Sequence, residues 1–222
     1  GHSHCGSQGS QSLNWRLVLD PAGSGPWNMA ADEYLLETAQ QPTLRLYSWQ
    51  GPWLSLGYAQ RSHWLENLPL QEHSIQVVRR PSGGRAVLHD QELTYAIVLP
   101  EAQGTIQEVY EQITDLWLGC LRSFATDLAR SAGSRRGQPN PSCYQLTQRG
   151  EVCMQDRKLI GSAQVRRGRR LLQHGSIPLQ VDAKRFSAVF GQSELPATLP
   201  GLTPRLLLAN FPHPLQELPW SE

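Results

Sequence analysis

Residues 79–99, RRPSGGRAVLHDQELTYAIVL, form the stretch around which we expect the rest of the chain to be organised. Pro81 lacks a backbone donor, so the strand that precedes it cannot continue through it. The pair Gly83-Gly84 permits positive φ angles and lets the backbone approach a ligand closely. From Ala86 onward, apolar residues alternate with small or polar ones, as in a half-buried strand. The stretch therefore predicts strand, glycine loop and strand, and spacing alone favours a plain hairpin loop over a ligand site.

The sequence around this stretch predicts an α+β protein, in which strands pair in meanders with helices between them. The expected strands are 15–19, 43–49, 53–58, 148–154, 158–165 and 170–181, the last three forming an antiparallel meander. The expected helices are 27–38, about 105–130 and 182–190, with a partly helical connection at 61–73. Beyond about residue 193 the chain is rich in proline and is expected to wrap the surface.

Composition indicates an ordinary globular protein. The chain has 222 residues, which fits one large domain, and because nothing marks a boundary we expect a single domain over residues 13–222. Residues 1–12 have no apolar core, so they predict a disordered tail or an expression-tag remnant rather than a signal peptide. No run of about 18 apolar residues occurs, so no membrane span is predicted, and we expect a cytoplasmic protein.

The net charge of +1 argues against a nucleic-acid-binding protein, although basic residues cluster at Arg79, Arg80, Arg85 and 166–170. These clusters are either solvated turns or a docking patch for an acidic carrier protein. The four cysteines show neither a C-x-x-C pair nor zinc-ligand spacing, so no metal is expected and the thiols are expected to be reduced. Cys120 lies on the apolar face of a predicted helix and is expected to pack in the core.

Three blocks of sequence resemble the biotin/lipoate protein ligase superfamily. They are the opening stretch, the segments DRKLIGSAQ (156–164) and LQHGSI (172–177), and NMAADE (28–33), which resembles the family's first helix. The resemblance extends over roughly residues 13–182 and implies mixed and antiparallel sheets flanked by helices. It also implies a substrate site formed by Arg80, Ser82, Gly83, Gly84, Arg85, His89, Gly161, Ser162, Ala163, Gln173, His174, Gly175 and Tyr58. Asp32 and Glu33 are interpreted as acids that favour a helix start.

The family contains ATP-dependent lipoate–protein ligases and octanoyltransferases, and residues 140–144, NPSCY, bear on the choice. They resemble the P-x-C-[FY] segment of the LipM-type octanoyltransferases rather than the R-N-D-I segment of the ligases. Arg85 stands where the ligases usually carry a third glycine, and we expect no counterpart of the ligases' accessory domain after the catalytic core. These departures point away from ATP, so no cofactor is expected.

The resemblance implies that Cys143 carries the acyl group, because a thiolate is both a strong nucleophile and a good leaving group. A free thiol is mostly protonated at neutral pH and needs a cation or base nearby. Lys158 is the candidate for this role, and it could lower the thiol's pKa, move protons or orient the carbonyl. The Gly83-Gly84 amides could stabilise the oxyanion. Without the resemblance, Cys143 would be an incidental thiol and Lys158 a solvated turn residue.

The expected donor is octanoyl-acyl carrier protein. The expected acceptor is a lipoyl domain of a 2-oxoacid dehydrogenase or the glycine cleavage H protein, with neither nucleic acid nor membrane as a partner. Three alternatives remain open: an ATP-dependent ligase, an amidotransferase between two lipoyl domains, and a non-catalytic binder of carrier protein. Cys153 is a rival nucleophile, while His89, His174, Gln164 and Gln173 are interpreted as shaping the site. Leu56, Tyr58 and Val87 are candidates for an apolar tunnel, where burying each CH₂ is worth about 0.8 kcal/mol.

Overall fold

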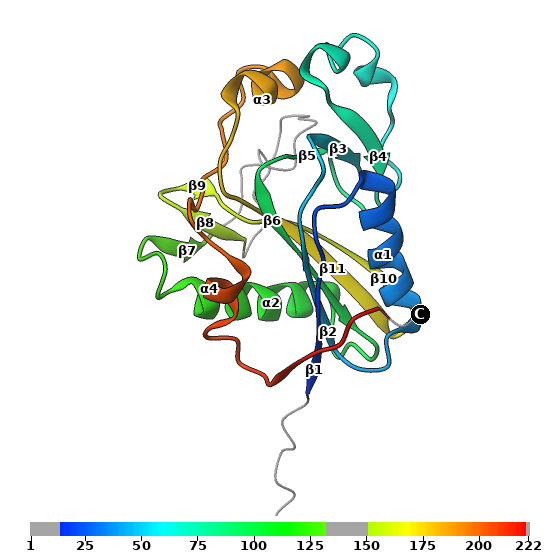
Figure 1. Ribbon diagram of the computed structural model, residues 1–222, viewed down its shortest axis with the longest axis vertical. Helices are drawn as coiled ribbons and strands as arrows, with labels where there is room; N and C mark the ends of the chain where they lie inside the picture. The colour runs from blue at the N-terminus through cyan, green and yellow to red at the C-terminus, as the bar shows by residue number, and fades with distance from the viewer. Residues whose placement is uncertain (1–13, 132–150, 221–222) are drawn as a thin grey trace, which may run out of the picture.

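The computed structural model describes residues 14–131 and 151–220. A six-stranded mixed sheet forms its centre, as Figure 1 shows, with the strand order β10-β11-β6-β2-β1-β12. These strands are β1 (Trp15–Leu19), β2 (Thr43–Tyr47), β6 (Glu92–Leu99), β10 (Gly161–Arg167), β11 (Arg170–Pro178) and β12 (Leu215–Glu217). The predicted α+β class is confirmed.

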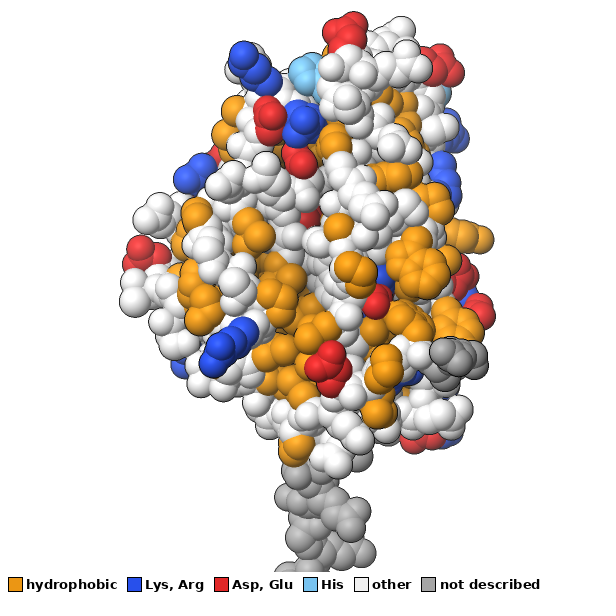
Figure 2. Space-filling view, in the orientation of Figure 1, with side chains coloured by type: hydrophobic (Ala, Val, Ile, Leu, Met, Phe, Trp, Pro, Cys, Tyr) orange, Lys and Arg blue, Asp and Glu red, His pale blue; other side chains and the backbone are white. Residues whose placement is uncertain are grey.

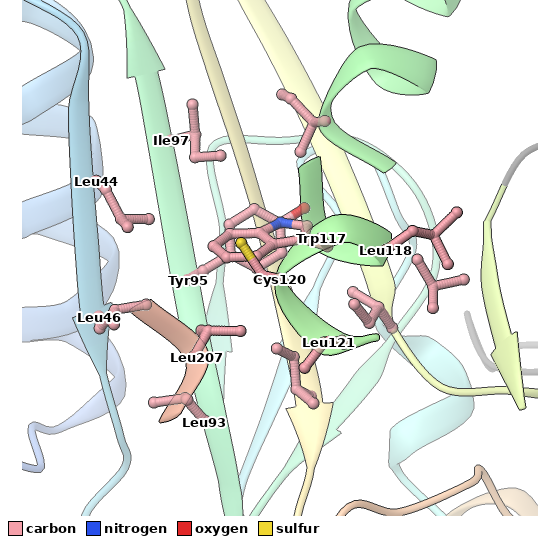
Figure 3. Close-up of a cluster of buried hydrophobic side chains, with 14 of the residues drawn as sticks. Leu44, Leu46, Leu93, Tyr95, Ile97, Trp117, Leu118, Cys120, Leu121 and Leu207 are labelled. Carbon is pink, nitrogen blue, oxygen red and sulfur yellow. The ribbon is translucent and has the colours of Figure 1, made fainter. Parts of the chain in front are cut away.

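Helices α1 (Gly25–Thr38) and α2 (Ile106–Leu121) pack on opposite faces of this sheet (Figure 1). Successive residues of a strand point to opposite faces, so β2 and β6 serve two cores. Tyr95 and Ile97 pack beneath α2 with Trp117 and Cys120, as Figure 3 shows, whereas Ala96 and Val98 pack on the α1 side. The prediction that Cys120 belongs to the core is confirmed.

A second, three-stranded sheet with the order β4-β3-β5 corrects the expected hairpin. β3 (Trp53–Leu56) runs parallel to β4 (Gln76–Arg79) and antiparallel to β5 (Val87–His89). The glycine loop thus connects two strands that flank β3 and do not pair with each other, so the hairpin interpretation was wrong. The apolar pattern after Ala86 is also not one strand, because β5 and β6 belong to different sheets.

A third sheet consists of β7 (Leu128–Arg130), β8 (Val152–Met154) and β9 (Arg157–Lys158). The long helix expected to reach about residue 130 ends at Leu121, because the chain turns there and enters β7. The predicted meander is right for the pairs β8–β9 and β10–β11. It is wrong between β9 and β10, because the buried residues Leu159 and Ile160 carry the chain from one sheet to the other.

Ser24 caps α1, and Pro26 lies in the first turn as predicted. The buried face, however, includes Asn28 and Asp32, while Trp27 and Tyr34 are each 53% exposed. These exposed rings contact Trp220 near the C-terminal end of the described chain. Figure 2 shows hydrophobic side chains gathered beside α1 and over β1, β2 and α4 (Pro204–Leu208).

The remaining elements agree with the sequence pattern. Asp182 caps α3 (Ala183–Phe190), and the 61–73 connection contains two 3₁₀ turns, η1 (His63–Leu65) and η2 (Gln71–His73). The proline-rich C-terminal part does more than wrap the surface, because β12 pairs in parallel with β1. Among the described residues, no helix is both long and apolar enough to cross a membrane.

Candidate active site

A pocket with about 340 Å³ of empty space, part of it open to solvent, is walled by residues of the central sheet, the three-stranded sheet and α1. The wall combines apolar side chains with a few polar ones, as binding sites do. Its residues are Met29, Tyr47, Trp49, Ser55, Arg80, Val87, His89, Thr94, 161–163 and 174–176.

The structure brings together many of the residues to which the family resemblance pointed. Arg80, His89, Gly161, Ser162, Ala163, His174 and Gly175 line the pocket, as does Val87 from the tunnel candidates. Ser82 and Gln173 are buried behind this wall. Gly83, Gly84 and Arg85 lie in the loop outside it. Tyr58 is 68% exposed and Leu56 packs in a separate core cluster, so neither lines this pocket.

Asp32, which seemed an ordinary helix-start acid, is the centre of a buried network. Its carboxylate accepts hydrogen bonds from Arg45 Nη1 (2.8 Å), Tyr47 Oη (2.6 Å) and His174 Nδ1 (2.9 Å). Burial raises the pKa of Asp32, but the hydrogen bond with His174 and the charge of Arg45 outweigh it and hold the pKa below its usual value. Asp32 is therefore an ionised acceptor inside the protein.

Arg45 is the positively charged partner with which Asp32 is buried in the core. Its side chain is fully buried, and besides Asp32 it binds Asp20 Oδ2 (2.6 Å) and Asn28 Oδ1 (2.9 Å). Its guanidinium lies 3.9 Å from the ring centre of Tyr47. A buried charge is tolerated only where it is paired and hydrogen-bonded. The network thus fixes β2 against α1 next to the pocket wall.

His174 links Asp32 to the glycine loop. Because an ionised carboxylate can only accept, Nδ1 of His174 donates to Asp32, and Nε2 is left to accept from the Ser82 hydroxyl. Burial lowers the pKa of His174 and outweighs the opposing effect of Asp32, so the imidazole is neutral at pH 7. One side chain on β11 therefore connects α1 with the loop that follows β4.

The neutral state of His174 predicts a pH-dependent stability. An unfolded histidine titrates near pH ~6.5, above the lowered pKa of folded His174, so the unfolded chain binds more protons between the two values. Stability is therefore fully present above about pH 6.5 and declines on acidification through that interval. Thermal unfolding from pH 7.5 to 5 measures the slope. His174→Gln is expected to flatten it, His63→Gln serves as an exposed control, and an unchanged slope in His174→Gln would contradict the assignment.

A second histidine in the pocket wall, His89 on β5, forms a similar chain of hydrogen bonds. Its Nε2 lies 2.7 Å from Ser55 Oγ, and its Nδ1 lies 3.1 Å from Glu92 Oε1. The indole of Trp49 stacks on the imidazole with 4.0 Å between ring centres. Arg80 donates to Ser55 Oγ at 3.1 Å. Each histidine is thus oriented by a carboxylate on one nitrogen and a serine on the other.

Arg80 holds the glycine loop rather than reaching into solvent. It is 4% exposed, and its Nη2 donates to the carbonyls of Gly83 and Arg85 at 2.8 Å each. Gly84 has a φ of +98°, a conformation that favours glycine. The loop also packs against Gly57, the residue that follows β3, because a Cβ there would stand only 1.9 Å from the carbonyl oxygen of Gly84.

Gly57→Ala is therefore expected to displace the glycine loop. The blocking atom is backbone, so the clash cannot be relieved by turning a side chain, and a loss of about 1–3 kcal/mol in the free energy of unfolding is expected. Chemical denaturation measures it. The control is Gly119→Ala on α2, where a Cβ meets nothing within 4 Å, and the expected change is a gain of up to about 1 kcal/mol. Equal stabilities for the two variants would contradict the close contact.

Lys158 is not the solvated turn residue that its sequence context alone would indicate. It is 3% exposed, and its Nζ lies 3.0 Å from Glu151 Oε1, which also accepts from Tyr110 Oη at 2.9 Å. Lys158 does not line the pocket, but it precedes the pocket residue Gly161 by three positions in the chain. Its partner Cys143 lies outside the described residues, so the expected pairing of the two stays a prediction.

Cys153, the rival nucleophile, is a poor one. It lies in β8 and is 8% exposed. Burial, reinforced by the nearby negative charge of Glu151, raises the pKa of its thiol. A thiol that stays protonated is a weak nucleophile, which argues against Cys153 as the nucleophile.

Most of the clustered arginines are already engaged within the chain. Arg79 donates to the carbonyls of Gly57 and Gln60, and Arg170 to those of Leu36 and Ala39. Arg167 bridges Glu33 (2.7 Å) and Glu37 (2.8 Å) on α1. These contacts favour a structural role over the docking patch for an acidic carrier.

Several pocket residues escaped sequence reasoning, and most of them are ordinary strand residues. They are Met29, Tyr47, Trp49, Ser55, Thr94 and Ser176. The sequence did contain one signal for the buried network, because an arginine within the apolar strand TLRLY needs a buried acid as its partner. Asp32 satisfies that need from the preceding helix.

Comparison with known families identifies this architecture. A family model described as the lipoyl protein ligase A/B catalytic domain matches residues 24–198. The chain therefore belongs to this family. Among solved structures of the same fold are lipoate-protein ligase A bound with ATP (TM-score 0.73, 19% identity, 96% of this chain and 90% of that one) and a bipartite lipoate protein ligase from Thermoplasma acidophilum (TM-score 0.73, 19% identity, 95% and 88%).

Within the family, the chain is similar to proteins named Octanoyltransferase LipM. The relative from Carboxydothermus hydrogenoformans is 40% identical over 186 residues, which cover 79% of this chain and 68% of the relative. The relative from Bacillus subtilis is 35% identical over 196 residues, covering 81% and 70%.

Proposed function

We propose that this chain is an octanoyltransferase of lipoate biosynthesis, which moves an octanoyl group from carrier protein to the lysine of a lipoyl domain. The observation that carries the proposal is the similarity to octanoyltransferases over most of the chain, together with the NPSCY segment that contains Cys143. The glycine cleavage H protein is a further acceptor. We place the reaction in the cytoplasm and assign it no cofactor.

The pocket suits an acyl chain. Met29, Tyr47, Trp49 and Val87 supply apolar wall, and burial of each CH₂ is worth about 0.8 kcal/mol. The wall also has a polar side, formed by Arg80, His89 and His174, and the carbonyl end of the substrate would lie toward it. This division explains how one pocket can take a substrate that is apolar at one end and polar at the other.

The chemistry takes two acyl transfers. The Cys143 thiolate attacks the thioester carbonyl, a new C–S bond forms, and the carrier's C–S bond breaks to release its thiolate, which takes up a proton. The acceptor lysine then attacks as a neutral amine, the amide C–N bond forms, and the Cys143 sulfur leaves as the thiolate while the nitrogen loses a proton to water or a base. Because both sulfur compounds are thioesters, no ATP is consumed in the first step. Lys158 supplies positive charge that favours the thiolate.

The test is mass spectrometry of the purified protein mixed with octanoyl-carrier protein. A mass increase of one octanoyl group, mapped to Cys143 and removed by hydroxylamine, supports the proposal. Two parallel mixtures contain octanoate with Mg-ATP, or an octanoylated lipoyl domain as donor. Labelling of a lipoyl domain only with Mg-ATP would replace the proposal with a ligase. Labelling only from the octanoylated domain would replace it with an amidotransferase, and no labelling in any mixture would favour a non-catalytic binder.

A further inference from the structure

Glu151 has no role in the proposed chemistry, yet it is among the most buried charged groups in the described part of the chain. The side chains of Glu151 and Lys158 are each 1% exposed, and 3.0 Å separates Oε1 from Nζ. Tyr110 on α2 donates its hydroxyl to the same oxygen at 2.9 Å. Two opposite charges and a phenol thus meet where the β8–β9 hairpin contacts α2 through β8.

The stability of the folded protein does not by itself account for a buried ion pair of this kind. Removing two charges from water carries a desolvation penalty of several kcal/mol per ion, and apolar residues of the same size are often equally or more stabilising. A buried pair does, however, keep both groups charged and hold them in one place. Those are the properties required of a cation that stabilises the Cys143 thiolate in the proposed reaction.

The backbone fixes the same lysine independently. β8 and β9 form a hairpin in which Cys153 is opposite Lys158 and Met154 is opposite Arg157. The two connecting residues, Gln155 and Asp156, have φ angles of 51° and 61°. This turn geometry suits Asn, Asp and Gly, so Asp156 fits it, whereas Gln155 is strained in it by about 1–3 kcal/mol. Strain of this kind persists only where the surrounding structure imposes it.

Further hydrogen bonds fasten Lys158 on both sides. The amide of Leu159 donates to the carbonyl of Val152 at 2.9 Å, next to Glu151. The carbonyl of Lys158 itself accepts from the amide of Ala197 at 2.9 Å. The main chain of the lysine is thus held while its ammonium is held by Glu151.

We propose that Glu151 is the positioning residue for Lys158 and makes it a fixed cation rather than a proton shuttle. Tyr110 locks the carboxylate, and the carboxylate keeps the ammonium charged and stationary three residues before the pocket wall at Gly161. This inference rests on the proposed function, and it selects one of the three roles open to Lys158. The lysine then stabilises the thiolate through its charge and neither donates nor accepts a proton during transfer.

The test measures the reactivity of the Cys143 thiol as well as its acylation. The rate of alkylation of Cys143 by iodoacetamide, measured from pH 6 to 10, reports the fraction of thiolate, and rapid-quench mass spectrometry reports acylation by octanoyl-carrier protein. Glu151→Gln is expected to lower both rates at pH 7 at least tenfold and to shift both pH profiles to higher pH. Glu151→Asp is expected to restore part of each rate. Lys158→Ala is expected to resemble Glu151→Gln, and Glu101→Gln is the exposed control.

The outcomes separate the inference from the function on which it rests. If folded Glu151→Gln matches the unmodified protein in both profiles while Lys158→Ala is inactive, Glu151 has no positioning role and the proposed function stands. If Lys158→Ala acylates normally, the catalytic role of the lysine itself fails. If Glu151→Gln does not fold, Tyr110→Phe takes its place, with an expected loss of about threefold or more in both rates, and unchanged rates would overturn the inference.

Discussion

Cys143→Ala is expected to reduce octanoyl transfer to a lipoyl domain at least about 10³-fold, because removal of a covalent nucleophile leaves only binding and electrostatic catalysis. Transfer is measured by the mass shift of the acceptor. The same variant should carry no octanoyl group after incubation with octanoyl-carrier protein.

The matched control is Cys153→Ala, which removes a buried thiol whose pKa is raised and is expected to change the rate less than about threefold. Near-normal transfer by Cys143→Ala would remove the covalent mechanism altogether. Loss of transfer in Cys153→Ala would point to damage of the β8–β9 hairpin, in which that residue lies.

Asp32→Ala is expected to produce the largest loss of stability among single substitutions in the site, about 3–5 kcal/mol, because it leaves the fully buried Arg45 short of a counter-charge. It also removes the acceptor of Tyr47 and His174. Such a loss is a large fraction of the total stability of a typical domain, about 5–15 kcal/mol. Urea denaturation measures it.

The neighbouring acid supplies the control. Glu33 lies next to Asp32 on α1, but its ion pair with Arg167 is exposed, with side chains 43% and 39% accessible. Glu33→Ala is therefore expected to cost less than about 1 kcal/mol. Losses of similar size for the two variants would show that the buried network does not hold this part of the fold together.

The sequence was sufficient for most elements because their periodicities are local properties of the chain. The ranges predicted for β1, α3 and β11 agree closely with the structure. Pairing between distant strands was not predictable in this way. The insertion of β3 between β4 and β5 depends on contacts that no alternation pattern encodes.

The site residues likewise divide into those that local sequence predicted and those that depend on distant contacts. Residues of the resembling blocks, such as His89 and His174, line the pocket. Asp32 was misjudged because an acid near a helix start has an adequate local explanation. Only the position of Arg45, on a strand that packs against the same helix, shows that the acid points inward. Buried polar networks are thus hard to recover from one sequence, since each member looks unremarkable alone.

The Asp32–His174–Ser82 connection has a consequence for how the molecule forms. Its two hydrogen bonds join residues separated by 142 and 92 positions along the chain. Contacts between residues so far apart in the sequence form late in folding, because closing a long loop costs chain entropy before the contact stabilises the structure. During synthesis, which proceeds from the amino end, the pocket cannot exist until β11 has left the ribosome. Nascent chains that stop short of His174 would thus be unable to retain an acyl ligand, however much of the central sheet they had already built.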